Sequence, residues 1–310
     1  MPSSCPVQLG RPRNPAWRLG WQGVTNITDD SIRFAFIPTN GIRLHTALAG
    51  PEDGEPVILL HGCPDAWFGW EPQIHALTAA GFRVIAPDQR GYNLSDKPKG
   101  IASYRMHTLV ADVVGLADSL GFERFCLAGH DFGAMVGWHM GMRYPERLRR
   151  LAIANVPHPV VLRSYIRKHP SQIIKSWYAF FFQLPALPEL IVRAGNWRLL
   201  MSAMPVGLSE KERDRYREAW AQPSAMTSMI NWYRSMLRRP PKLTESPRIS
   251  VPTLVIWGKQ DPYISYGMAP LSVDLCDYGR LVTFEDATHW VQHDKPEEVS
   301  HLLIEHFRGE

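Results

Sequence analysis

The chain has 310 residues and a mass of 35.2 kDa, enough for one compact domain or for one domain that carries an inserted subdomain. Hydrophobic residues make up 45% of it and charged residues 21%, which is ordinary for an enzyme with a sizeable core. Its 34 basic and 30 acidic residues leave a formal charge of +4, spread along the chain, and this balance predicts neither nucleic-acid nor membrane binding.

Residues 1–30 are rich in Pro, Gly and Trp without periodicity, and we expect an arm that lies over the surface. A β-hairpin is predicted next, because strand-like runs at 31–38 and 42–49 flank Thr-Asn-Gly at 39–41, a strong turn signal. Short apolar runs then alternate with helical periodicity, which predicts an α/β fold with a mostly parallel central sheet flanked by helices. The expected strands are 56–60, 83–87, 124–128, 151–155, 253–257 and 281–284, and the expected helices are 108–120, 133–143 and 297–307.

The strand signal disappears between Pro157 and about Ser246. This stretch is helical in pattern, interrupted by prolines and rich in aromatic residues. We interpret 157–246 as a helical lid, or cap subdomain, inserted into a core formed by 31–156 and 247–310.

No segment approaches the roughly 18 continuous apolar residues of a membrane span, and the Arg-rich stretch at 11–18 is not followed by an apolar run of signal-peptide length. We therefore expect a cytoplasmic protein. The cysteines are widely scattered and form no CxxC pair, which predicts free thiols and favours neither a disulfide framework nor a zinc site. They are Cys5, Cys63, Cys126 and Cys276.

The sequence Gly-His-Asp-Phe-Gly at 129–133 follows an expected strand and opens an expected helix, which is the context of a nucleophile elbow. The turn is so tight that its neighbours must be small, as Gly129 and Gly133 are. The residue at its apex projects over the sheet from a strained backbone, and here it is Asp131 in place of the usual serine. The motif alone is weak evidence, because most buried aspartates cap helices or pair with arginine.

Three further features support the elbow. The sequence His-Gly-Cys-Pro at 61–64 ends a strand, where the α/β-hydrolase layout forms an oxyanion hole, and we expect its backbone N–H groups from Cys63 and Phe132. Asp261 follows a strand, where the acid of a catalytic triad belongs, and His289 follows the last strand. Nucleophile, acid and histidine therefore occur in the chain order that this fold uses.

A carboxylate nucleophile narrows the reaction. Attack on an ester or amide carbonyl would give a high-energy anhydride, whereas attack on a saturated carbon gives an ordinary ester as the covalent intermediate. The leaving group is then an epoxide oxygen or a halide. We expect His289 to activate water against the ester carbonyl while Asp261 holds the histidine in the right tautomer.

The two leaving groups differ in what they need. A departing halide needs only N–H donors, whereas an opening epoxide becomes an alkoxide, to which a tyrosine with an ordinary pKa of about 10 can donate a proton. The expected lid contains two candidates, Tyr178 in the run 176–183 and Tyr233 in Asn-Trp-Tyr-Arg at 231–234. Lid tyrosines are more often packing residues, but beside an aspartate elbow they form a candidate acid pair. The expected pocket residues are Trp177, Phe181, Trp232, His61 and Pro64.

With these motifs the chain resembles the epoxide hydrolases of the α/β-hydrolase fold, of the soluble and microbial type, from about Ser31 to Phe307. The elbow and triad are shared with haloalkane dehalogenases, so the two tyrosine motifs are the specific part. The resemblance implies that Asp131 attacks an epoxide carbon while Tyr178 and Tyr233 protonate its oxygen, and that water then releases a vicinal diol. It implies no metal and no organic cofactor, with an epoxide and water as reactants. The aromatic residues of the expected lid, together with Phe132, indicate a small hydrophobic epoxide. The sequence is compatible with either a monomer or a homodimer.

Phe132 stands where the family often has Trp, and we expect this change to alter only the shape of the pocket. Cys63 stands where an aromatic is more usual, and we expect it to pack as a small residue rather than to act as a reactive thiol. A haloalkane dehalogenase is the nearest alternative, although neither side chain has the N–H that binds halide; Trp177 could serve instead. A fluoroacetate-type haloacid dehalogenase would carry Arg in place of Phe132. A catalytically retired binding protein is a third alternative, which predicts the loss of a chemical residue that the chain retains. A serine esterase is disfavoured, because no Ser occupies the elbow.

Overall fold

The structure, a computed structural model, describes residues 32–310 with the exception of 243 and 245, so that the expected N-terminal arm and Cys5 lie outside the described residues. Its sheet has eight strands in the order β1-β2-β4-β3-β5-β6-β7-β8, parallel from β4 to β8, with antiparallel pairing from β1 to β2 and from β2 to β4. The predicted mostly parallel sheet is confirmed. The strands are β1 Ile32–Thr39, β2 Ile42–Ala49, β3 Pro56–Leu60, β4 Arg83–Pro87, β5 Phe125–His130, β6 Leu148–Ala154, β7 Thr253–Gly258 and β8 Gly279–Phe284.

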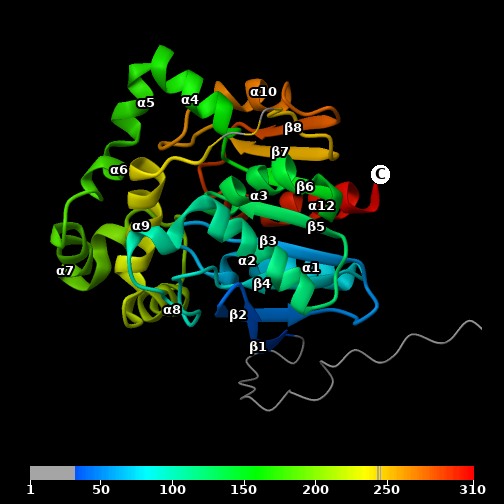
Figure 1. Cartoon of the computed structure of the whole chain (residues 1–310), viewed down its shortest axis with the longest axis horizontal. Coiled ribbons are helices and arrows are strands. Elements are labelled where there is room, and N and C mark those ends of the chain that lie inside the picture. Colours follow the sequence, from blue (N-terminus) through cyan, green and yellow to red (C-terminus); the bar gives the residue numbers. More distant parts are fainter. Residues whose placement is uncertain (1–31, 243, 245) are drawn as a thin grey trace, which may run out of the picture.

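Helices cover both faces of this sheet (Figure 1). Successive strand residues point to opposite faces, so Ile58 and Leu60 of β3 belong to the core beneath α2 and α3. Val57 and Leu59 of the same strand belong to the core beneath α1 and α12. Burial on both faces explains why the inner strands are continuously apolar. The helices that accompany the sheet are α1 Glu71–Ala79, α2 Met106–Ser119, α3 Phe132–Arg143, α10 Met268–Val273, α11 Val291–Asp294 and α12 Pro296–Arg308, and short 3₁₀ helices lie at Trp67–Trp70, Ile101–Tyr104 and Pro145–Arg147.

The predicted hairpin is present at the edge of the sheet. Thr39 pairs with Ile42, and the two residues between them, Asn40 and Gly41, have φ values of 41° and 76°. Both values lie in the left-handed region, which Asn and Gly tolerate better than other residues, and they are the signature of a tight hairpin turn.

Six helices, α4 to α9, lie in the chain between β6 and β7 and gather on one side of the sheet (Figure 1). Among the described residues from 157 to 246, the structure contains helices and turns but no strand, in agreement with the helical pattern of the sequence. No helix in the described part of the chain has both the length and the apolar character needed to cross a bilayer. The six helices are α4 Pro159–Lys168, α5 Pro170–Lys175, α6 Trp177–Phe181, α7 Leu187–Met201, α8 Glu210–Ala221 and α9 Ala225–Arg238.

Candidate active site

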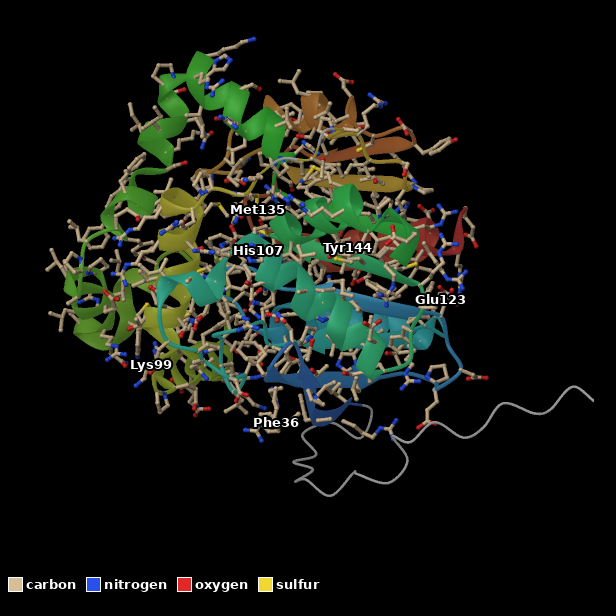
Figure 2. All side chains as sticks on the ribbon, viewed as in Figure 1. Phe36, Lys99, His107, Glu123, Met135 and Tyr144 are labelled. Atoms are coloured by element: carbon tan, nitrogen blue, oxygen red, sulfur yellow. The ribbon has the colours of Figure 1, made fainter. Side chains whose placement is uncertain are left out.

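The turn between β5 and α3 has the geometry expected of a nucleophile elbow. Asp131 adopts φ 50° and ψ −120°, a conformation that is strained for any residue with a side chain. Its carbonyl accepts the first helical hydrogen bond of α3, from the N–H of Met135 at 3.0 Å, and Figure 2 shows Met135 near the start of this helix. A Cβ at Gly129 would lie 2.4 Å from the carbonyl oxygen of Gly133, so the first of these small residues is required by the closeness of the backbone.

The loop after β3 lies directly against the apex of the elbow. The N–H of Cys63 donates to Oδ1 of Asp131 at 2.8 Å. A Cβ at Gly62 would lie 2.3 Å from the Cβ of Asp131, so only glycine allows this approach. Phe132, the other expected oxyanion residue, is buried and begins α3 immediately after Asp131. One side of the carboxylate is thus held by a backbone donor.

His289 lies between two carboxylates. Its Nδ1 is 2.7 Å from Oδ2 of Asp261, and its Nε2 is 3.4 Å from Oδ2 of Asp131. The three residues follow β5, β7 and β8, whose carboxyl ends meet at one edge of the parallel sheet. The structure therefore brings together the nucleophile, histidine and acid that the sequence predicts.

Asp261 is fixed by several donors. The N–H groups of Tyr263 and Ile264 bind its Oδ1 at 2.7 and 2.8 Å. The amide of Asn155 donates to its Oδ2 at 2.9 Å, the oxygen that also faces His289. Asn155 follows β6 with a positive φ of 51°, and its side chain also accepts from the N–H of Gly258 at 2.9 Å. Asn155 is not among the residues predicted from the sequence; its place directly after a buried strand is the signal that could have indicated it.

The charged forms of His289, Asp131 and Asp261 stabilise one another. Burial disfavours the charged form of His289, but Asp261 and Asp131 outweigh this effect and raise its pKa to about 10. Burial likewise opposes the ionised forms of Asp131 and Asp261, and contact with His289 nevertheless lowers the pKa of both carboxyls. In the free protein at neutral pH Asp131 is therefore an ionised carboxylate beside the imidazolium of His289.

The two lid tyrosines face the carboxylate. Tyr178 on α6 and Tyr233 on α9 line the same cavity as Asp131, and their ring centroids are 5.8 Å apart with nearly perpendicular planes. Burial raises the pKa of both phenols, and the negative charge of Asp131 raises it further. Both hydroxyl groups are therefore protonated and able to donate hydrogen bonds.

The cavity has a volume of about 220 Å³ and a mostly apolar wall. Trp177, Phe181 and Pro64, which the sequence suggests as pocket residues, are part of this wall. Its members are Cys63, Pro64, Asp131, Trp177, Tyr178, Phe181, Phe182, Val192, Leu199, Leu200, Ser202, Ala203, Tyr233, Tyr263, His289 and Trp290.

Two expected pocket residues are corrected by the structure, because neither lines the cavity. His61 is wholly buried beneath it, where its ring nitrogens contact the carbonyl of Gly62 and the N–H of Gln89. Trp232 is also buried; its indole N–H donates to the carbonyl of Arg90 at 3.0 Å. On helix α9 adjacent residues point about 100° apart, so Trp232 faces the core when the next residue faces the cavity.

Other members of the wall were not found from the sequence. The ring centroid of Tyr263 is 5.8 Å from that of Tyr178 and 5.4 Å from that of His289, so this residue contacts both a candidate proton donor and the histidine. Leu199 and Leu200 reach the cavity because α7 is interrupted at 194–197, where three consecutive residues have positive φ. No periodic pattern announces such an interruption. The position of Tyr263, two residues after the expected acid Asp261, could have indicated that it lies at the site.

Comparison with known proteins agrees with this geometry. The family model described as alpha/beta hydrolase fold matches residues 55–296. The AB hydrolase superfamily protein YfhM of Bacillus subtilis is 43% identical over 91% of this chain and 100% of its own, and epoxide hydrolase 4 of Mus musculus is 34% identical over 86% and 77%. A crystal structure of a variant of an epoxide hydrolase from Bacillus megaterium superposes with a TM-score of 0.82 at 31% identity, covering 89% of this chain and 100% of that one.

The chain therefore belongs to the α/β-hydrolase family. Within that family its similar relatives and structural neighbours include many that are named epoxide hydrolases, which confirms the resemblance drawn from the tyrosine and elbow motifs.

Proposed function

We propose that this protein hydrolyses epoxides to vicinal diols through an ester formed on Asp131. One observation carries the proposal: two protonated phenols and an ionised carboxylate line the same apolar cavity. The carboxylate supplies a nucleophile for saturated carbon, and the phenols supply the proton donors that a departing alkoxide requires. The names of the relatives support the same reaction.

In the first step an oxygen of Asp131 attacks one epoxide carbon. The carbon–oxygen bond of the ring breaks as the ester bond forms. Tyr178 and Tyr233 both hydrogen-bond to the epoxide oxygen, and one of them transfers its proton to it. The hydrogen bond from Cys63 N–H to Oδ1 fixes the rotation of the carboxylate. Orientation of this kind contributes much of the rate enhancement in such displacements.

In the second step His289 accepts a proton from water, and the resulting hydroxide adds to the ester carbonyl. Esterification removes the negative charge of Asp131, and with it one of the influences that raise the pKa of His289. At neutral pH a larger fraction of His289 is therefore neutral, and able to accept a proton, in the ester than in the free protein. The N–H groups of Cys63 and Phe132 would stabilise the tetrahedral oxyanion. Its collapse breaks the ester bond, and the departing alkoxide takes the proton held by His289 to complete the diol. The carboxyl proton left on Asp131 returns to the tyrosinate, which restores both the carboxylate and the phenol.

We also assign α4 to α9 as the lid, with 157–246 as its limits and 31–156 and 247–310 as the core. This stretch contributes both tyrosines and much of the apolar wall, including Phe181 and Val192. The wall favours a small hydrophobic epoxide.

The test is product analysis on aryl and alkyl epoxides beside matched haloalkanes, with wild type, Asp131→Ala and the exposed control Asp53→Ala. We expect diol from wild type and the control, none from Asp131→Ala, and no halide release. A single turnover in ¹⁸O-labelled water should place unlabelled carboxylate oxygen in the diol and ¹⁸O on Asp131. Halide release without diol would establish the dehalogenase alternative, and ¹⁸O in the first diol would exclude the ester.

A further inference from the structure

Exposed apolar side chains are concentrated on the outer helices of the lid. Of the fifteen large apolar side chains that are exposed in the described part of the chain, ten lie between 173 and 206. Figure 1 shows α5, α6 and α7 following one another along the outer margin of the molecule. Patches of this kind usually mark an interaction surface. We call these ten residues the outer lid face; they are Ile173, Ile174, Trp177, Phe180, Leu184, Leu187, Leu190, Ile191, Leu199 and Val206.

The spacing of these residues is that of an organised face. In the first half of α7, Leu187, Leu190 and Ile191 are exposed, whereas Pro188 and Val192 are buried. Residues three and four apart lie on the same side of a helix, so the first half of α7 presents an apolar stripe to solvent. An ordinary surface helix shows the opposite arrangement, with its apolar stripe toward the core.

The same segment is strongly basic. From 158 to 209 the chain has six Lys or Arg residues and one acidic residue, a net charge of +5, whereas the whole chain carries +4. The acidic residue, Glu189, is largely buried and paired with Arg234 at 2.7 Å, so it does not face solvent. The exposed basic side chains of the segment 158–209 have no ion-pair partner among the described residues. They are Arg163, Arg167, Lys168, Arg193 and Arg198.

We propose that the outer lid face docks on an anionic phospholipid surface. Exposed apolar side chains and exposed Lys and Arg in the same segment match such a surface in both respects. The apolar side chains enter the interfacial region, and the basic side chains meet the lipid phosphates. A second copy of the chain fits less well, because a symmetric dimer through this face would oppose one basic surface to another. The sequence-based expectation of no membrane contact rested on charge averaged over the chain, which hides the local excess.

The outer lid face adjoins the cavity. Trp177 and Leu199 belong both to the outer lid face and to the wall of the cavity. Docking would therefore place this part of the cavity wall against the bilayer, where apolar molecules are concentrated. Delivery of an apolar epoxide from the bilayer rests on the proposed function, whereas docking itself does not.

The test is sedimentation of the full chain with vesicles of phosphatidylcholine alone and with vesicles in which roughly 30% is phosphatidylserine. Wild type should bind the anionic vesicles and release them at high salt. The charge variant Arg167→Glu/Lys168→Glu/Arg193→Glu should bind roughly 100-fold more weakly, and Ile174→Ser/Leu190→Ser about tenfold more weakly.

The matched control is Phe36→Ser/Tyr278→Ser, which removes two exposed rings outside the lid; Figure 2 labels Phe36 on β1. It should bind like wild type. Thermal unfolding checks that each variant is folded. Because vesicle binding is measured without an epoxide, failure of docking is distinguishable from failure of the proposed chemistry. No binding, equal binding to both vesicles, or self-association that Ile174→Ser/Leu190→Ser abolishes would each overturn the proposal.

Discussion

The edge of the sheet and the lid hold their candidate catalytic groups in different ways. Asp131, Asp261 and His289 each follow a strand, and the two carboxylates are bound by backbone N–H groups. Tyr178 and Tyr233 lie on separate lid helices and pack through their rings. Sheet topology thus fixes the first set, whereas side-chain packing fixes the second. Substitutions at the sheet edge should remove a chemical step, and substitutions in the lid should misplace a proton donor.

One buried arginine joins the two tyrosine-bearing segments. Arg234, next to Tyr233 on α9, donates to the carbonyl oxygens of Phe182 and Leu184 at 2.9 and 2.6 Å, just after α6. Glu189 on α7 binds the same guanidinium at 2.7 and 3.1 Å. This cluster is the lid's nearest equivalent to the backbone donors of the sheet edge.

The largest effect is expected for His289→Gln. Ester formation should continue while ester hydrolysis slows about 10,000-fold, because His289 is the only histidine among the described residues that line the cavity. Mass spectrometry should show the protein with one added epoxide. The control Asp131→Ala/His289→Gln should show no adduct; an adduct in this double variant would place the nucleophile elsewhere.

Removal of the lid hydroxyls should have the next largest effect. Tyr178→Phe and Tyr233→Phe should each lower kcat/KM about 10- to 100-fold, and the double variant about 1,000-fold or more. Phenylalanine keeps the ring packing and loses only the proton donor. Epoxides that open to weakly basic alkoxides should lose less rate in these variants than epoxides that open to strongly basic ones. An equal loss of rate for both kinds would contradict protonation by these tyrosines.

A smaller effect is expected from Glu189→Gln. The substitution leaves the buried guanidinium of Arg234 without its counter-charge, although its bonds to backbone carbonyls remain. We expect a loss of about 2–3 kcal/mol in the free energy of unfolding and a fall of about tenfold in kcat. Glu210→Gln, at an exposed ion pair, should change neither. An unchanged kcat in Glu189→Gln would show that the tyrosines keep their positions without the cluster.

The smallest effect is in the pH dependence of stability. The pKa of His289 is raised to about 10, so its stabilising contribution is complete below the unfolded pKa of about 6.5 and is lost as pH rises to the folded value. Asp131 and Asp261 have lowered pKa values, so their contribution is present above about pH 4 and is lost in acid. The difference in unfolding free energy between wild type and His289→Gln should therefore be greatest between about pH 4 and 6.5. A difference that grew toward pH 10 would contradict these shifts.

Much of the sheet and its edge could be predicted from the sequence, because the buried parallel strands are continuous apolar runs and Asp131 and Asp261 follow two of them. The strands at 56–60 and 83–87 agree with β3 and β4 to the residue. β5 is longer than expected: it extends to His130, because a strand can include glycine where another backbone packs closely, as at Gly129.

The lid was less predictable for a physical reason. Both faces of its helices carry apolar residues, one toward the cavity and one toward solvent, so hydrophobicity does not tell them apart. Phe180 is more than half exposed, whereas its neighbour Phe181 lines the cavity. α1 and α10 were missed because both are short and follow irregular segments.

The place at which the lid is inserted has a consequence for how such proteins diversify. The chain leaves the sheet at β6 and returns at β7, and these two strands are neighbours. The ends of the insertion are thus held close together by the sheet, and the entropy of closing a segment between fixed ends rises only slowly with its length. Recombination can exchange or lengthen everything between them while the sheet stays intact. Substrate range and the candidate proton donors are then inherited separately from the candidate nucleophile and its histidine.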